Sequence, residues 1–222
     1  FSVCFAYVNV PGKDILMDPF FNLLSSGFHR ALNEFNANFQ SLELKPGESL
    51  IKRLSEKGNP RFDGIILLSY SPSPQEMRRL EKSGTRLVVL GKPSPGLKIS
   101  YVDMDNFNGA YQVVKHLADF GRRRILFLNN ENSDRRDGFE KAVSDLALDK
   151  KNCYVEYVIP WSKESGKEAV LRLIDGRKSF DSIIVLGDWA TFGAMEGVRE
   201  KGFRVPEDIS FVMYDDYSWV EM

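Results

Sequence analysis

The feature that most constrains the fold of this chain is a regular alternation between short apolar runs and stretches with helical periodicity. Each run is four to six residues long, rich in valine, isoleucine or leucine, and apolar on both faces. That pattern is typical of parallel strands covered by helices on two sides. The runs occupy residues 3–8, 64–68, 87–90, 125–128, 182–186 and 209–213, and weaker strand signals lie at 39–44, 99–102 and 154–159.

Amphipathic helices are predicted between these strands, because apolar side chains recur there at intervals of three and four residues. Four stripes are clear, at 24–35, 110–117, 139–146 and 192–198. Gly121 and Gly202 each follow a helical stretch, where a left-handed residue commonly ends a helix, and Asp18 before Pro19 has the signature of a helix start.

Strands that alternate with helices imply parallel sheets with right-handed crossovers. Roughly nine strands are too many for one small sheet of this kind. We therefore predict an α/β fold of two doubly wound parallel-sheet lobes that flank a ligand cleft. Residues 1–120 would form the N-terminal lobe and residues 121–222 the C-terminal lobe.

Composition limits the classes of function. A chain of 222 residues buries enough surface to fold without disulfides or metals, and its net charge of −1 argues against a domain that grips nucleic acid by itself. No apolar run approaches a membrane span, and the first residues lack the basic lead of a signal peptide. Cys4 and Cys153 are predicted to be buried thiols in a reducing compartment, which favours a cytoplasmic protein with no membrane partner.

The motifs of common enzymes are missing. The sequence has no glycine-rich phosphate loop and no nucleophile elbow, and its two histidines, His29 and His116, fall in predicted helices. A helix start or a hinge explains the adjacent Asp215 and Asp216 as well as catalysis does, and a solvated loop explains the basic run 122–124. We predict no catalytic residue, no metal ligand and no cofactor.

Polar and aromatic side chains follow the predicted strands where each strand ends. Ligands of open parallel sheets bind beyond these carboxyl ends. The candidates after the strands are Ser69, Tyr70, Arg135, Trp161, Asp188, Trp189 and Asp215. An aromatic face surrounded by Asp, Asn and Arg suits a small polyhydroxylated or heterocyclic ligand, although an Asp at a helix start is often only a cap. Phe20 and Phe21 are candidates too, with core packing as the alternative, since two adjacent aromatics cannot both face inward.

The motifs that carry a family resemblance are spread over essentially the whole chain. They are Asp18-Pro19-Phe20-Phe21, residues 61–66, residues 102–106 with Gly109, Ala110, His116 and Leu117, and residues 121–125, 135–139, 202–210 and 214–216. Together they resemble the effector-binding core of the lactose/galactose-repressor family of bacterial transcription regulators, which shares its fold with periplasmic sugar-binding proteins. The order and spacing of the last two motifs favour the regulator branch.

The resemblance implies roles for particular residues. Arg135 is similar to the family's effector-binding arginine, and Trp161 to its stacking aromatic. Asp188 and Asp215 resemble the carboxylates that bond effector hydroxyls or ring nitrogens, while Phe20 and Phe21 resemble residues that close the cleft from the first lobe. Gly187 replaces a common Asn, as in purine-type relatives, so a purine-like effector stays open beside a sugar.

The expected function is therefore the ligand-sensing core of a transcription regulator, often a repressor. A small metabolite would change the closure of the lobes and thereby DNA binding. By resemblance, the operator would be bound by a helix-turn-helix ahead of Phe1, in a homodimer, and a C-terminal return segment would follow Met222. The alternatives are a secreted sugar-type solute-binding receptor and an enzyme on a similar frame.

Overall fold

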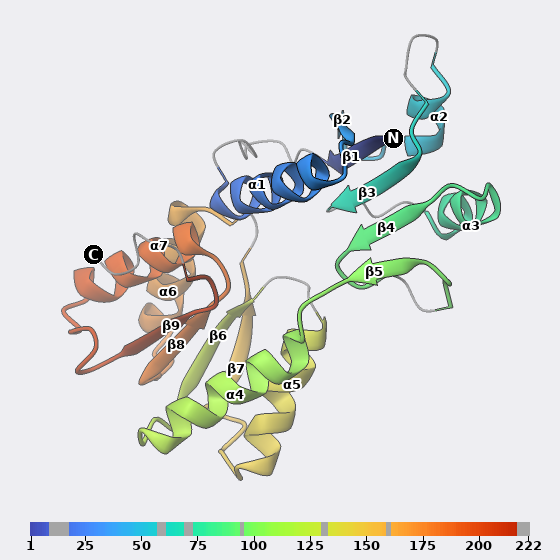
Figure 1. Ribbon diagram of the computed structural model, residues 1–222. Coiled ribbons are helices and arrows are strands. Elements are labelled where there is room, and N and C mark those ends of the chain that lie inside the picture. Colours follow the sequence, from blue (N-terminus) through green and yellow to red (C-terminus); the bar gives the residue numbers. More distant parts are fainter. Residues whose placement is uncertain are drawn as a thin grey trace. The chain divides into compact units, whose positions relative to one another are not determined.

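The computed structural model describes residues 1–8, 18–56, 61–68, 73–93, 96–129, 133–158 and 161–216 (Figure 1). Contacts within the chain divide it into two compact units, Phe1–Met104 and Asp105–Met222. Each unit is built on one sheet in which all paired strands are parallel. The predicted α/β fold of two parallel-sheet lobes is confirmed.

The first unit has a five-stranded sheet in the order β2-β1-β3-β4-β5. Every apolar run predicted in this part is a strand, and so are the two weaker signals. The strands are β1 (Ser2–Val8), β2 (Asn38–Leu44), β3 (Gly64–Leu68), β4 (Leu87–Leu90) and β5 (Ser100–Val102), and the helices are α1 (Pro19–Glu34), α2 (Leu50–Leu54) and α3 (Pro74–Lys82).

Helices cover both faces of this sheet because successive side chains of a strand point in opposite directions. Phe5 and Tyr7 of β1 belong to a core cluster with Phe21 of α1. Cys4 and Ala6 belong to a different cluster, with buried residues of α2 and α3. The alternation of β1 therefore places α1 on one face and α2 with α3 on the other.

The predicted start of α1 is confirmed. Asp18 is the N-cap, and its carboxylate accepts hydrogen bonds from the amides of Phe20 at 2.9 Å and Phe21 at 3.3 Å. Pro19 follows at the first helical position, where its missing N–H leaves no intrahelical bond unmade.

The second unit has a four-stranded sheet in the order β7-β6-β8-β9. Its helices lie on both faces of the sheet, α4 and α5 on one and α6 and α7 on the other (Figure 1). The strands are β6 (Ile125–Asn129), β7 (Tyr154–Tyr157), β8 (Ser182–Val185) and β9 (Ser210–Met213), and the helices are α4 (Asn106–Asp119), α5 (Ser133–Asp145), α6 (Lys163–Asp175) and α7 (Asp188–Glu200).

The alternation along β6 shows how these layers are built. Ile125 and Phe127 pack in one core cluster with residues of α4 and α5, whereas Leu126 and Leu128 pack in another with residues of α6 and α7. All four side chains are fully buried. Such a strand reads as a continuous apolar run because both of its faces are covered.

The two units divide earlier in the chain than the predicted lobe boundary after residue 120. Residues 105–120, which include α4, are expected in the N-terminal lobe but fall in the second unit. The physical reason is the apolar stripe of α4: Val114 and Leu117 are buried in the same cluster as Phe127 of β6 and Phe139 of α5.

Helices α6 and α7 approach each other to backbone contact. A Cβ on Gly166 would lie 2.2 Å from the carbonyl oxygen of Ala190, and a Cβ on Gly193 would lie 1.7 Å from that of Lys163. Both positions therefore require glycine, because any side chain would overlap the facing main chain. Gly138 of α5 faces the Phe107 carbonyl of α4 in the same way, at 2.0 Å.

Candidate functional site

The carboxyl ends of the strands in the second unit lie at one edge of its sheet. Leu128 of β6 is in register with Val185 of β8, which in turn is in register with Met213 of β9. Asn129 ends β6 opposite Tyr157 of β7. The segments that follow these strands carry Arg135, Trp161, Asp188 and Asp215, so we call this edge, with these four residues, the candidate effector edge.

Trp161 lies beside the turn that begins α7. Its ring carbon Cε3 is 3.9 Å from the position of a Cβ on Gly187, an ordinary van der Waals distance. The ring is partly buried and packs against the core clusters on both faces of the sheet. The next residue, Ser162, caps α6 in a reciprocal pair with Ser165, which fixes the chain directly after the tryptophan.

Asp188 is the first residue of α7, directly after Gly187. The N-cap of α7 is Gly187, which makes no side-chain cap bond, and Asp188 is the acidic residue of the first turn. Oδ1 of Asp188 accepts a hydrogen bond from the Trp189 amide at 2.8 Å. Trp161 and Asp188 thus flank the same glycine, and the structure brings these two candidates together.

Arg135 lies in the first turn of α5 and packs on Tyr214, the residue before Asp215. Its guanidinium carbon is 5.4 Å from the centroid of the Tyr214 ring, a cation–π contact. The ring centroids of Tyr214 and Phe127 are 6.3 Å apart, so core packing holds the ring. Burial raises the pKa of the Tyr214 hydroxyl, although the nearby Arg135 charge works in the other direction.

Tyr214 is therefore a further candidate site residue, which the sequence motifs do not predict. In the sequence it is only one member of the 214–216 motif. The available signal was its place directly after the ninth apolar run, where an aromatic can support a neighbouring arginine. Arg135 therefore contacts the residue directly before Asp215.

Trp189 lies differently from Trp161. Its side chain is 54% exposed, and among the described residues its ring contact is edge-to-face with Phe192, at 6.2 Å between centroids. That contact runs along the outer surface of α7. Trp189 thus lies next to Asp188 in sequence without sharing the packing of Trp161.

The aromatic pair after β1 is split between the core and the surface. Phe21 is 5% exposed, with its centroid 5.5 Å from that of Phe5 and 5.0 Å from that of Tyr7. Phe20 is 40% exposed. Packing is the role that the structure gives Phe21, and Phe20 is the ring of the pair that stays open to a ligand. Ser69 and Tyr70 lie outside the described residues.

Within the described ranges, no group of three or more His, Cys, Asp or Glu side chains is placed to hold a metal ion. Among the same residues, no helix combines the length and the apolar character needed to cross a bilayer.

The relatives with similar sequences named here are transcription regulators. The HTH-type transcriptional regulator CelR of Thermobifida fusca is 28% identical over 96% of this chain and 65% of its own length. The HTH-type transcriptional repressor PurR of Haemophilus influenzae is 28% identical over 76% of this chain and 52% of its own. This chain thus spans about half to two thirds of these relatives.

Two solved structures of transcription regulators also superimpose on this chain. A transcriptional regulator CelR–cellobiose complex superimposes with a TM-score of 0.83 and 26% identity, over 99% of this chain and 69% of that one. A LacI family regulator from Enterococcus faecium with bound ribose has the same fold, with a TM-score of 0.80 at 24% identity, over 98% and 79% of the two chains. The profile of the family described as periplasmic binding proteins and sugar binding domain of LacI family matches residues 11–220. The chain belongs to this family.

Proposed function

We propose that this chain is the effector-sensing part of a cytoplasmic bacterial transcription regulator, and that its effector is a sugar. The observation that carries the proposal is the candidate effector edge, where Trp161 flanks Asp188 and Arg135 packs on the tyrosine beside Asp215. An aromatic face suits the apolar face of a sugar ring, and the carboxylates and the guanidinium suit its hydroxyls.

The relatives support a sugar more than a purine. The CelR structure that this chain resembles is a complex with cellobiose. A purine-like ligand stays the second candidate, because Gly187 stands where the family commonly has an asparagine. In either case, the effector would shift DNA binding because it binds one arrangement of the two units better than another.

DNA binding itself is proposed for the whole protein. A helix-turn-helix ahead of Phe1 would contact the operator, and a second copy of the protein would bind the paired half-site as a homodimer. The named relatives are transcription regulators, which favours this reading over a secreted receptor and over an enzyme. The coding sequence upstream of Phe1 tests the choice: a helix-turn-helix agrees with it, and an export signal contradicts it.

Calorimetry tests the site. Cellobiose and hypoxanthine are titrated into the 222-residue chain and its variants. Trp161→Ala should abolish measurable binding, and Trp161→Phe should restore much of it, because a ring that can stack is retained. Arg135→Ala should likewise abolish binding.

Arg136→Ala is the matched control. Arg136 is the next residue of α5, but its side chain is half exposed and pairs with Glu140 at 2.7 Å. Its loss should leave the affinity unchanged. Unchanged affinity in both Trp161→Ala and Arg135→Ala, with circular dichroism as in the parent chain, would refute the assignment of the site.

A further inference from the structure

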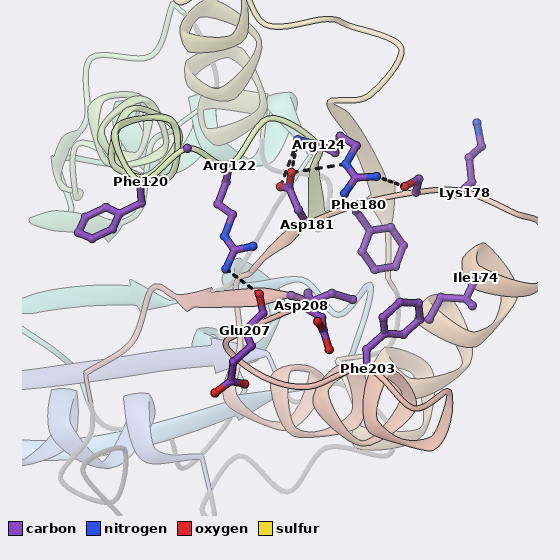
Figure 2. A pocket seen from close by; sticks show the side chains of 13 residues that line it. Phe120, Arg122, Arg124, Ile174, Lys178, Phe180, Asp181, Phe203, Glu207 and Asp208 are labelled. Carbon is purple, nitrogen blue, oxygen red and sulfur yellow. Dashed lines mark hydrogen bonds and ion pairs between the residues drawn. The ribbon is translucent and has the colours of Figure 1, made fainter.

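The second unit contains a cavity at the edge of its sheet opposite to the candidate effector edge. Its volume is about 540 Å³. It lies where β6, β8 and β9 begin, and it is lined by the segments that precede these strands together with the ends of α4 and α6 (Figure 2). The volume falls within the range of small-molecule sites.

One wall of the cavity is apolar and consists of phenylalanine and isoleucine side chains. Phe180 is 6% exposed and Ile209 is 1% exposed, so they form a fixed apolar surface. Phe203, which also lines the cavity, leaves 39% of its surface open to solvent, and Phe120 leaves 75%. Exposed rings beside a hollow favour a ligand with a flat apolar body.

The carboxylates that line the cavity are largely matched within the protein. Asp181 accepts hydrogen bonds from the amides of Arg123 at 3.1 Å and Arg124 at 3.2 Å, and pairs with the Arg124 guanidinium. Asp208 accepts from the Arg204 side chain, Nε and Nη2, at 3.0 Å each. This contact lowers the pKa of Asp208 to about 2. Both acids are thus committed to protein partners.

Arg122 differs from these groups. Its Nη2 donates to the main-chain carbonyl of Pro206 at 2.8 Å and to that of Glu207 at 3.4 Å. Neither acceptor carries a charge, and among the described residues no carboxylate forms an ion pair with this guanidinium. Figure 2 shows the Glu207 carboxylate pointing away from it. Among the described residues, this partly buried cation is thus hydrogen-bonded only to main-chain carbonyls, while its charge also acts on the Asp208 carboxylate and helps to lower the pKa of that group.

We propose that this cavity is a second ligand site, separate from the effector site, that binds a small aromatic carboxylate. The carboxylate would pair with Arg122, and the ring would pack against Phe180 and Phe203. A hydrogen bond from a guanidinium to a carboxylate is stronger than one to a neutral hydroxyl. The carboxylate should therefore add affinity beyond that of the ring alone.

The probes are 1-naphthoate and its neutral counterpart, 1-naphthalenemethanol. They are titrated into the 222-residue chain, and amide chemical shifts are followed by NMR. We expect saturable shifts from 1-naphthoate at residues 120–124 and 203–209, and an affinity for the alcohol that is lower by about tenfold or more. No saturable shift, or shifts confined to Trp161 and Asp188, would overturn the proposal.

Variants separate the two contributions. Arg122→Gln keeps a donor for the carbonyls but removes the charge, so it should weaken 1-naphthoate by about tenfold or more and leave the alcohol unchanged. Phe203→Ser should weaken both probes, whereas Phe107→Ser, at a ring of similar exposure (41%) in α4, should weaken neither. Equal loss of both probes in Arg122→Gln contradicts the ion pair. Trp161→Ala should not change the affinity for 1-naphthoate, so failure of the effector site would not affect this test.

Discussion

Replacement of Gly193 by alanine tests the backbone contact between α6 and α7. The added Cβ would lie 1.7 Å from the carbonyl oxygen of Lys163, 2.7 Å from its carbonyl carbon and 3.0 Å from its Cα. These are main-chain atoms, which cannot rotate away as a side chain can. The two helices must therefore separate by more than about 1 Å, and the packed residues between them lose contact.

The change in the free energy of unfolding can be estimated from two opposing effects, helix propensity and overpacking. Alanine in the middle of a helix is favoured over glycine by about 1 kcal/mol. Overpacking costs about 1–3 kcal/mol, and a clash with rigid main chain belongs at the upper end of that range or beyond. Gly193→Ala should therefore lower the free energy of unfolding by about 2 kcal/mol or more, which is about 1 M in the urea midpoint for a typical slope.

Two other glycines of the second unit provide controls. Among the described residues, a Cβ on Gly109 would meet only Tyr214 Cε1 within 4 Å, at 3.7 Å, and a Cβ on Gly197 would lie 3.2 Å from the Lys167 oxygen. Gly109→Ala should stabilise the unit, and Gly197→Ala should fall between the other two. Tryptophan fluorescence reports on this unit, since all three tryptophans follow residue 104. A Gly193→Ala midpoint within about 0.2 M of the parent, or equal loss in all three variants, would refute the reasoning.

Three further predictions concern stability and reactivity. Tyr154→Phe should raise the free energy of unfolding by about 1 kcal/mol, because the Tyr154 hydroxyl is buried without a hydrogen-bond partner among the described residues; a lower urea midpoint would contradict this. Hydrogen bonds from Lys163 and Lys167 lower the pKa of Glu196 from 4.5 to about 2. The resulting stabilisation is complete above pH 4.5 and is lost as the pH falls towards 2, so Glu196→Gln should flatten this part of the stability curve, and an unaltered curve would count against the ion pairs. Burial raises the pKa of Cys4 to about 12 and also raises that of Cys153, so a thiol reagent at about pH 8 should label both only after urea is added; rapid labelling of the native protein would show that the thiols are accessible.

The strands could be predicted from the sequence because both faces of each sheet are covered. Ile183, Ile184 and Val185 are buried on opposite sides of β8, so the run has no polar gap. The ends of two helices could also be predicted from the local sequence. Gly121 and Gly202 have φ of 81° and 83°, the left-handed geometry expected after a helix.

Features that depend on distant partners were harder to predict. The stripe of α4 showed that it packs on something, but not on which sheet, and it joined the second unit rather than the first. The apolar pattern of the sequence does not predict α3, because only Met77 and Leu80 are buried in an otherwise charged segment. The close approach of α6 and α7 depends on glycines whose neighbours lie 24 or more residues away in the chain.

In the candidate site, too, local features could be predicted from the sequence and tertiary contacts could not. The placement of Trp161, Asp188 and Arg135 could be predicted, since a residue that follows a parallel strand lies at the same sheet edge as its counterparts. Whether Phe20 or Phe21 faces inward could not, because adjacent positions of a helix differ only in their tertiary neighbours. Tyr214 was missed because its part depends on Arg135, a residue of another element.

The glycines between α6 and α7 also have a consequence for how a ligand would be selected. Trp161 precedes the cap of α6 and Asp188 begins α7, so the two groups sit at the ends of helices locked together at Gly166 and Gly193. Main-chain contact between the two helices therefore sets the spacing of these two groups. In the proposed effector site, this set spacing would exclude a ligand ring of the wrong width. Selectivity could change by replacement of either side chain while the two helices keep their positions.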